Sequence, residues 1–256
     1  MVQVTRRSFL LSAAAFSAGC ASRGHGAAQP TPATGARQPA VGQSWRYAKH
    51  DLYSRKLVDD QTDRITAVGT TVDIDSQSEA VAASKTERPS WGSSWLSKYV
   101  PHPDTPPDRA LPSEIQQPWG KILVDPHWGQ VQVYETPIPL WPIQLRAGWK
   151  YHVITKYKTP THQDGLPWDQ TMTVRGWETV TVPAGTFKAL RYQNLINFRS
   201  TDLSWTAAQR MESIWFAPEV GRWVVRESSG SYYINDSSVD TPYDESSYRW
   251  ELLAWT

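Results

Sequence analysis

Apolar and polar residues alternate along much of this chain. Trp149, Tyr151 and Val153 alternate with Lys150 and His152, and this period of two is typical of a strand with one buried face. The same period recurs near the C-terminus. No segment shows the 3.6-residue period of a helix of three or more turns. The expected fold class is therefore all-β, built as an antiparallel sheet.

Two turns with distinct residue patterns separate the predicted strands. Pro183 presets φ for the first turn position, and Gly185 supplies the left-handed residue that closes a three-residue hairpin with a bulge. Residues 218–221 repeat the pattern, with Pro218 at the start and Gly221 at the end. Consecutive hairpins of closely spaced strands favour a curved meander. We therefore expect a strongly curved sheet or an open half-barrel.

Residues 101–142 depart from this pattern, because they hold ten of the nineteen prolines and proline cannot donate to a strand ladder. We expect a long proline-rich excursion over the surface or across a barrel mouth. A short hairpin at residues 122–133, turning near Trp128, interrupts it. Loops of this length are usually functional or poorly ordered, and Trp119 and Trp141, which give this one further anchors, favour function.

The two hairpins resemble a known group of proteins. The segments concerned are WETVTVPAGTFKA at residues 177–189 and WFAPEVGRWVVRE at residues 215–227. They resemble the V-P-A-G-T-F and W-x-A-P-x-V-G hairpins that occur together in uncharacterised bacterial envelope lipoproteins, whose fold is similar to the curved half-barrel of lipoprotein carrier proteins. The opening VGQSWRY at residues 41–47 is similar to the start of such domains. These are turn formers and core aromatics, so the resemblance implies a fold and no catalytic residue.

The first residues of the chain are typical of an export signal. Arg6 and Arg7 precede Phe9, Leu10 and an apolar run of about ten residues, roughly half of what a membrane-spanning helix needs. The paired arginines resemble the twin-arginine signal, whose cargo crosses the membrane already folded. Export by the general secretory route is the alternative. The sequence thus predicts a signal peptide at residues 1–19.

Cys20 is the single cysteine of the chain and directly follows this segment. Together with the small residues before it, Cys20 resembles the lipobox of bacterial lipoproteins, although Ser17 stands where the family usually has Leu. The resemblance implies a membrane partner, because several acyl chains on Cys20, at about 0.8 kcal/mol per buried methylene, anchor a protein stably. Ordinary signal cleavage, which would release a soluble periplasmic protein, is the alternative.

The residues after the cysteine are predicted to be a tether. Residues 20–40 are rich in Gly, Ala, Pro, Thr and Gln and lack a periodic apolar face, so we expect a coil of about 25 Å end to end. Ala21 in place of Asp implies, by the same resemblance, anchoring in the outer membrane facing the periplasm. A single β-rich domain is expected over residues 41–256.

Composition and motifs exclude several classes of protein. The chain has 26 Lys plus Arg and 25 Asp plus Glu, for a net charge of +1, so bulk charge does not favour nucleic-acid binding. One cysteine excludes a disulfide scaffold. No Gly-x-Ser-x-Gly elbow, phosphate loop or zinc-ligand spacing is present. We expect no cofactor, no metal and no assigned catalytic residue.

Histidine and aspartate nevertheless occur close together at four places. A histidine oriented by a carboxylate can act as a base, so an envelope enzyme with a His/Asp site in the proline-rich region is an alternative function. His102 and His127 are the leading candidates for such a site because both lie in that region. The pairs are His50 with Asp51, His102 with Asp104, Asp125 with His127, and His162 with Asp164.

Aromatic content is the strongest functional indication. The 14 Trp, 11 Tyr and 5 Phe make up 12% of the chain, and Trp and Tyr suit sugar stacking, acyl-chain pockets and protein interfaces. Sheets also use aromatics as core partners. The leading hypothesis is non-catalytic binding of an apolar or glycan ligand or of an envelope partner. A structural interaction protein of an envelope assembly is a further alternative. The ligand-binding candidates, flanked by Pro, Gly or Ser, are Trp91, Trp95, Trp119, Trp128, Trp141 and Trp168.

Overall fold

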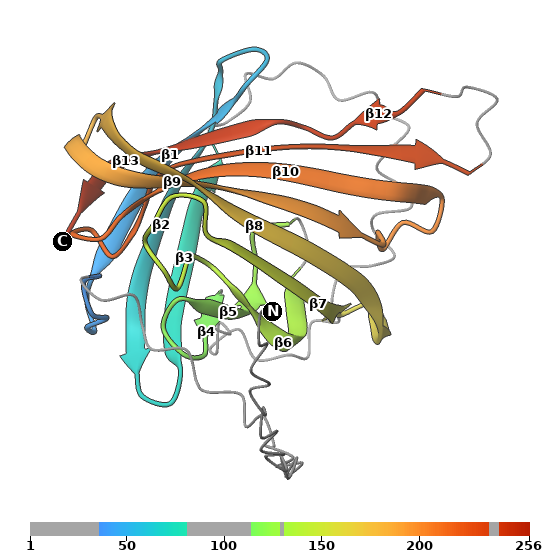
Figure 1. Ribbon diagram of the computed structural model, residues 1–256, viewed down its shortest axis with the longest axis horizontal. Coiled ribbons are helices and arrows are strands. Elements are labelled where there is room, and N and C mark those ends of the chain that lie inside the picture. The colour runs from blue at the N-terminus through green and yellow to red at the C-terminus, as the bar shows by residue number, and fades with distance from the viewer. Residues whose placement is uncertain (1–35, 81–113, 129–130, 236–240) are drawn as a thin grey trace, which may run out of the picture. The chain divides into compact units, whose positions relative to one another are not determined.

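The computed structural model describes residues 36–80, 114–128, 131–235 and 241–256, all within one compact unit, Thr31–Thr256. These residues form antiparallel strands and no helix (Figure 1). None of the described residues belongs to a helix long and apolar enough to cross a membrane. The strands are β1 (Ser44–Asp51), β2 (Leu57–Val68), β3 (Val72–Ala80), β4 (Glu114–Gln116), β5 (Lys121–Asp125), β6 (Gln132–Pro139), β7 (Lys150–Thr159), β8 (His162–Val182), β9 (Gly185–Phe198), β10 (Trp205–Ala217), β11 (Arg222–Ile234), β12 (Tyr243–Asp244) and β13 (Tyr248–Trp255).

The sheet closes on itself. Strands β1 to β10 pair with their neighbours in chain order, β13 joins β1 to β11, and β11 pairs with β10. Of the strands that the structure describes, only the short β12 lies outside this ring, along the far end of β11 (Figure 1). The predicted strongly curved antiparallel sheet is confirmed. Its curvature continues until the two edges meet, which pairs the backbone groups that an open edge would expose.

Both predicted hairpin turns are present. Val182 pairs with Gly185, so the turn between β8 and β9 contains two residues instead of the three expected. Gly185 has a φ of 137°, a value that residues with a side chain rarely adopt. The turn between β10 and β11 follows the second pattern, with Ala217 paired to Arg222 and Gly221 at a φ of 73°.

Part of the proline-rich region belongs to the sheet. Residues 114–139 supply β4, β5 and β6, and the hairpin expected at residues 122–133 is confirmed by the pairing of Val124 with Val133. β6 pairs with β7 only at Val133 and Tyr134. The prolines that follow in β6 therefore lie where no donor to β7 is required, which explains why a strand tolerates them. The earlier part of the predicted excursion, residues 101–113, lies outside the described residues.

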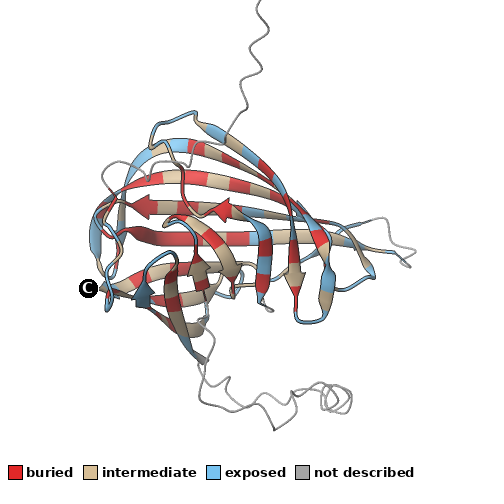
Figure 2. Ribbon diagram, turned by 90° about the horizontal axis from the view of Figure 1, so that it is seen from below, coloured by how far each residue is buried: buried red, intermediate tan, exposed pale blue. Residues whose placement is uncertain are grey.

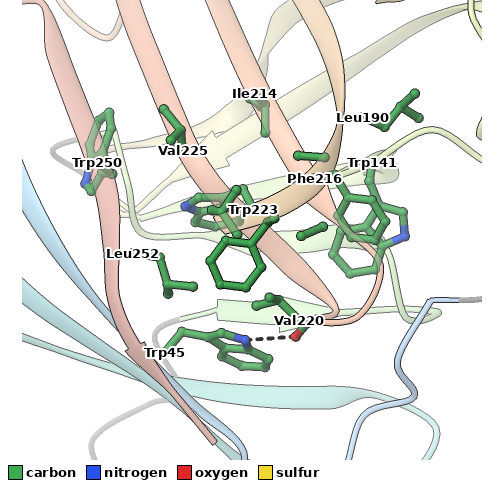
Figure 3. Close-up of a cluster of buried hydrophobic side chains, with 14 of the residues drawn as sticks. Trp45, Trp141, Leu190, Ile214, Phe216, Val220, Trp223, Val225, Trp250 and Leu252 are labelled. Carbon is green, nitrogen blue, oxygen red and sulfur yellow. Dashed lines mark hydrogen bonds between the residues drawn. The ribbon is translucent and has the colours of Figure 1, made fainter. Parts of the chain in front are cut away.

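Side chains fill the interior in two apolar clusters, one around Trp45 and Phe216 and the other around Tyr134 and Trp168. Figure 2 shows the alternation of buried and more exposed positions along the strands. In the first cluster the indole of Trp45 donates a 3.1 Å hydrogen bond to the carbonyl oxygen of Val220 (Figure 3). Such burial of aromatic area is the main source of stability in a closed sheet.

The chain joins this core before the predicted domain start at residue 41. Ala36 is buried in the first cluster, and the backbone N–H of Arg37 donates to the carbonyl oxygen of Pro218 at 2.8 Å. Residues 36–40 therefore belong to the folded domain rather than to the tether expected there. The rest of that tether lies outside the described residues.

Candidate ligand-binding site

A column of alternating aromatic rings and guanidinium groups runs through the interior. Each guanidinium carbon lies 4.0 to 5.3 Å from the centroids of the rings next to it. Cation–π contacts of this kind contribute about 0.5 to 2 kcal/mol each. The interior is thus filled by stacked charged and aromatic groups. In order, the column consists of Trp45, Arg222, Trp223, Arg226, Trp128, Arg210 and Phe198.

Arg222, at one end of the column, is fully buried between two carboxylates. Its Nη2 donates to Asp63 Oδ2 at 2.8 Å and to Glu114 Oε2 at 2.7 Å, and its Nη1 donates to Glu114 Oε1 at 3.1 Å. Burial alone would lower the pKa of Arg222, but Glu114 and Asp63 reverse this and raise it. The geometry satisfies the condition for a buried ion pair, because each charge faces an opposite one.

Arg226 occupies the middle of the column. Its Nε and Nη2 lie 2.8 and 2.6 Å from Glu212 Oε1, while the other carboxylate oxygen accepts from Asn194 at 3.0 Å. The space left beside this pair, about 20 Å³, would hold about one water molecule. This space is too small for an acyl chain.

The column opens into a pocket of about 400 Å³ at the end of the barrel where β1 stops and β13 starts. This volume lies within the usual range for small-molecule sites. We call this cavity the mouth pocket. A groove of about 620 Å³ adjoins it and shares Asp244, Glu245 and Ser246 with it. The mouth pocket has five aromatic lining residues, Trp128, Trp205, Tyr232, Tyr248 and Trp250.

Two of these rings form a face-to-face stack, which we call the aromatic platform. Trp205, at the start of β10, stacks on Tyr232 of β11 with a centroid distance of 3.5 Å and an interplanar angle of 3°. Tyr243 of β12 stacks on the same tyrosine at 5.8 Å. Because strand backbones hold all three rings, the platform is preformed and loses little conformational entropy when it binds a ligand.

Charged side chains flank the aromatic rings. Arg210 Nε and Nη2 donate to the two oxygens of Glu245 at 2.6 and 2.9 Å. Gly230 provides the space for this pair, since a Cβ there would collide with the Glu245 carboxylate. Lys49 Nζ lies 4.0 Å from the ring centroid of Tyr248. Burial lowers the pKa of Lys49, although the carboxylate of Asp59 opposes this.

The structure brings one predicted His/Asp pair together at the pocket wall. His127 Nδ1 lies 2.7 Å from Asp125 Oδ1, and Trp128 Nε1 donates to Asp125 Oδ2 at 3.0 Å. Burial would raise the pKa of Asp125, but the charge and hydrogen bonds of His127 lower it to about 2. His127 Nε2, the nitrogen a general base would use, lies 3.3 Å from the amide nitrogen of Gln61.

Of the other expected pairs that the structure describes, neither His50 with Asp51 nor His162 with Asp164 forms a hydrogen bond or an ion pair. His162 Nδ1 contacts the hydroxyl of Thr161, and His102 lies outside the described residues. A pair that the sequence analysis missed joins His152 Nε2 to Asp169 at 2.8 Å on the exposed face of β7 and β8. Only the strand register brings these residues together. Among the described residues, no cluster of His, Cys, Asp and Glu could hold a metal ion.

The six candidate tryptophans have different environments. Trp128 lines the mouth pocket. Trp141 and Trp168 are core residues with 4% and 1% exposure, and neither lines the mouth pocket. Trp119 packs against Trp141 in the first cluster. Trp91 and Trp95 lie outside the described residues, as do the export residues Arg6, Arg7, Phe9 and Leu10 and the lipidation candidate Cys20.

No protein-family model matches this chain, and no curated protein matches it. One similar solved structure is a presumed lipoprotein from Parabacteroides distasonis, with 14% identity, coverage of 88% of this chain and 100% of that chain, and a TM-score of 0.46. Another is a presumed exported protein with a YmcC-like fold from Bacteroides fragilis, with 10% identity, coverage of 85% and 96%, and a TM-score of 0.36. Since both TM-scores are below 0.5, the site is interpreted from its own geometry.

Proposed function

We propose that this protein is an exported, lipid-anchored binding protein that takes a saccharide in its mouth pocket. The observation that carries the proposal is the preformed platform of Trp205 and Tyr232 inside a cavity of about 400 Å³. Sugar rings present C–H faces that pack on such aromatic surfaces, while their hydroxyls require polar neighbours. The mouth pocket provides both, because charged and hydroxyl side chains flank its rings.

The composition of the pocket favours a saccharide over an acyl chain. An acyl chain would remove water from Lys49, Arg210 and Glu245 without replacing its hydrogen bonds, which costs free energy for each polar group. The small space beside Arg226 and Glu212 also leaves no apolar tunnel for a chain to enter. The adjoining groove near Ser246 would allow a ligand of more than one sugar ring.

Export and anchoring are supported by the sequence. The twin-arginine pattern at Arg6 and Arg7 and the lipobox-like placement of Cys20 favour an envelope protein held in the outer membrane by its lipids. An attached domain would then meet polysaccharide at the membrane surface. Labelled palmitate should be incorporated by the full-length chain and not by a Cys20→Ala variant, and labelling of both would contradict lipidation at this residue.

An envelope enzyme is the second candidate function, favoured by the 2.7 Å contact of Asp125 with His127. Two features favour binding over catalysis. The His127 side chain is 5% exposed, and its Nε2 faces Gln61 instead of open pocket. A base in this position would first have to break that contact before taking a proton from a ligand.

Native mass spectrometry of the full-length chain, purified from the membranes of the organism that produces it, tests the proposed function. We expect a co-purifying saccharide mass that is lost in Trp205→Ala. The matched control is Trp177→Ala, which removes an exposed ring from β8 outside the pocket and should retain the adduct. A chain without adduct, or one carrying a fatty acid or a protein partner, would contradict saccharide binding.

A further inference from the structure

Three donor groups at the wall of the mouth pocket lack an acceptor within the described part of the chain. Arg210 uses Nε and Nη2 on Glu245, but its buried Nη1 has no partner. Trp250 is 4% exposed, and its Nε1 is also unpartnered. Lys49 Nζ faces the rings of Tyr248 and Trp250 and forms no ion pair with a described residue. Unpartnered donors of this kind are destabilising until an acceptor reaches them.

The acidic side chains of the same wall are, in contrast, occupied. Both carboxylate oxygens of Glu245 accept from Arg210. Those of Asp125 accept from His127 and Trp128. Asp244 is the remaining acidic lining residue, and it lies exposed at the rim. The acidic lining residues therefore form no ion pair with Lys49, and Asp59, its register partner on β2, acts on it only through its charge.

We infer that the saccharide bound in the mouth pocket is acidic and that Lys49 and Arg210 hold its anionic group, a carboxylate or a phosphate. This inference rests on the proposed function. Lys49 is suited to the role because an ammonium partly surrounded by aromatic rings is less hydrated than one in water and gains more from an anion. The sugar ring would pack on the face of Trp205 that does not contact Tyr232, and Trp250 Nε1 would donate to a ligand oxygen.

Saccharides from the organism's own envelope test the inference. Oligosaccharides released by mild acid are separated by anion exchange into neutral and acidic fractions, and each is titrated calorimetrically into the full-length chain. We expect the acidic fraction to bind about 10-fold more tightly or better, the effect of a hydrogen bond to a charged group. Equal binding of the neutral fraction would overturn the inference and leave the proposed function intact. Failure of both fractions to bind would contradict the proposed function itself.

Chemical removal of the charged group from the oligosaccharides shows whether that group is a carboxylate or a phosphate. Carboxyl reduction converts uronic acids into neutral sugars with the same rings, and hydrogen fluoride removes phosphate. Loss of tight binding after reduction supports a carboxylate, and loss after hydrogen fluoride supports a phosphate. Binding that survives both treatments would overturn the inference, because no anionic group would then remain for Lys49 and Arg210.

Variants of Lys49 test whether the preference for the acidic oligosaccharides arises in the mouth pocket. Lys49→Met should lose about 10-fold in affinity for the acidic fraction while binding the neutral fraction as before, and Lys49→Arg should keep most of the preference. The matched control is Lys188→Met on the outer face, beside Trp177, which should bind like the unaltered chain. Circular dichroism verifies folding. An acid preference that Lys49→Met retains in full would overturn the role of Lys49.

Discussion

Arg222 and Arg210 lie at two ends of the same aromatic column. Arg222 is fully buried, and Asp63 and Glu114 pair with its guanidinium from two sides. Arg210 has a single carboxylate partner, and its buried Nη1 donates to no described residue. Both arginines stack on tryptophan. Because Arg222 Nε is also unpartnered, the difference lies in the number of carboxylates that pair with each guanidinium, two for Arg222 and one for Arg210.

This difference indicates which part of the interior supports the fold and which part is available to a ligand. A buried charge with opposite charges around it stabilises the native state only as a complete set, so removing one partner is costly. A charge with spare donors beside an open cavity gains from an external acceptor. Substitutions at the Arg222 end should thus change stability, and substitutions at the mouth pocket should change binding.

The largest expected effect is on stability at Arg222. Arg222→Met leaves Asp63 and Glu114 buried without a cation, which should lower the free energy of unfolding by about 3 to 5 kcal/mol, measured by urea denaturation of the full-length chain. Adding Asp63→Asn and Glu114→Gln to the same chain removes the uncompensated charge and should restore soluble, folded protein. A loss below about 1 kcal/mol for the single variant would show that the cluster does not support the fold.

Asp125, between the two ends, should make stability depend on pH. Its pKa is lowered to about 2 in the folded protein, whereas the unfolded value is near 4. Its contribution, about 2 kcal/mol, is therefore present above about pH 4 and lost as the pH falls towards 2. The free energies of unfolding of the unaltered chain and of Asp125→Asn, each measured as a function of pH, should converge over this interval. If the two free energies instead keep a constant difference across this pH range, His127 does not stabilise the Asp125 carboxylate.

A smaller effect is expected on binding at the aromatic platform. Trp205→Ala removes the ring that ends the stack on Tyr232 and should weaken saccharide binding about 10-fold, which corresponds to about 1.4 kcal/mol. Calorimetric titration with the envelope oligosaccharides measures this change. Trp177→Ala, which also removes an exposed indole, should leave the affinity unaltered. Equal losses in both variants would locate the effect outside the mouth pocket.

The smallest effect is expected at an ion pair outside the column. Arg46 Nη2 lies 2.5 Å from Asp60 Oδ2, but the Arg46 side chain is 57% exposed. Exposed pairs contribute about 0 to 1 kcal/mol because water and salt screen them. Arg46→Gln should therefore change the urea midpoint little, and a loss comparable to that of Arg222→Met would invalidate the contrast between buried and exposed arginines.

Local turn signals made part of this architecture predictable. Pro183 and Gly221 mark turns by their own backbone preferences, so the sequence pattern alone locates the hairpins. Closure of the sheet depends on β13 joining β1 to β11, a pairing between distant segments that no local pattern encodes. Prolines in the β6 segment suggested a loop, because the sequence does not reveal that β6 pairs only briefly with β7.

The candidate site was less predictable than the fold. Trp128 was identified by the turn residues around it, and it does line the mouth pocket. The same reasoning also selected Trp168, which is buried in the second apolar cluster and does not line that pocket. Lys49, Arg210 and Tyr232 were missed because they occur within ordinary alternating strands. Their inward orientation at one end follows from register and closure, which are tertiary properties.

The most direct test of the account is a proton–nitrogen correlation spectrum of the indole N–H groups, assigned by Trp→Phe variants and recorded as the acidic envelope oligosaccharides are added to the full-length chain. The account predicts that the signals of Trp128, Trp205 and Trp250 shift while that of the core residue Trp45 stays in place. A spectrum without shifts, or with shifts confined to Trp177 on the outer face, would contradict saccharide binding in the mouth pocket.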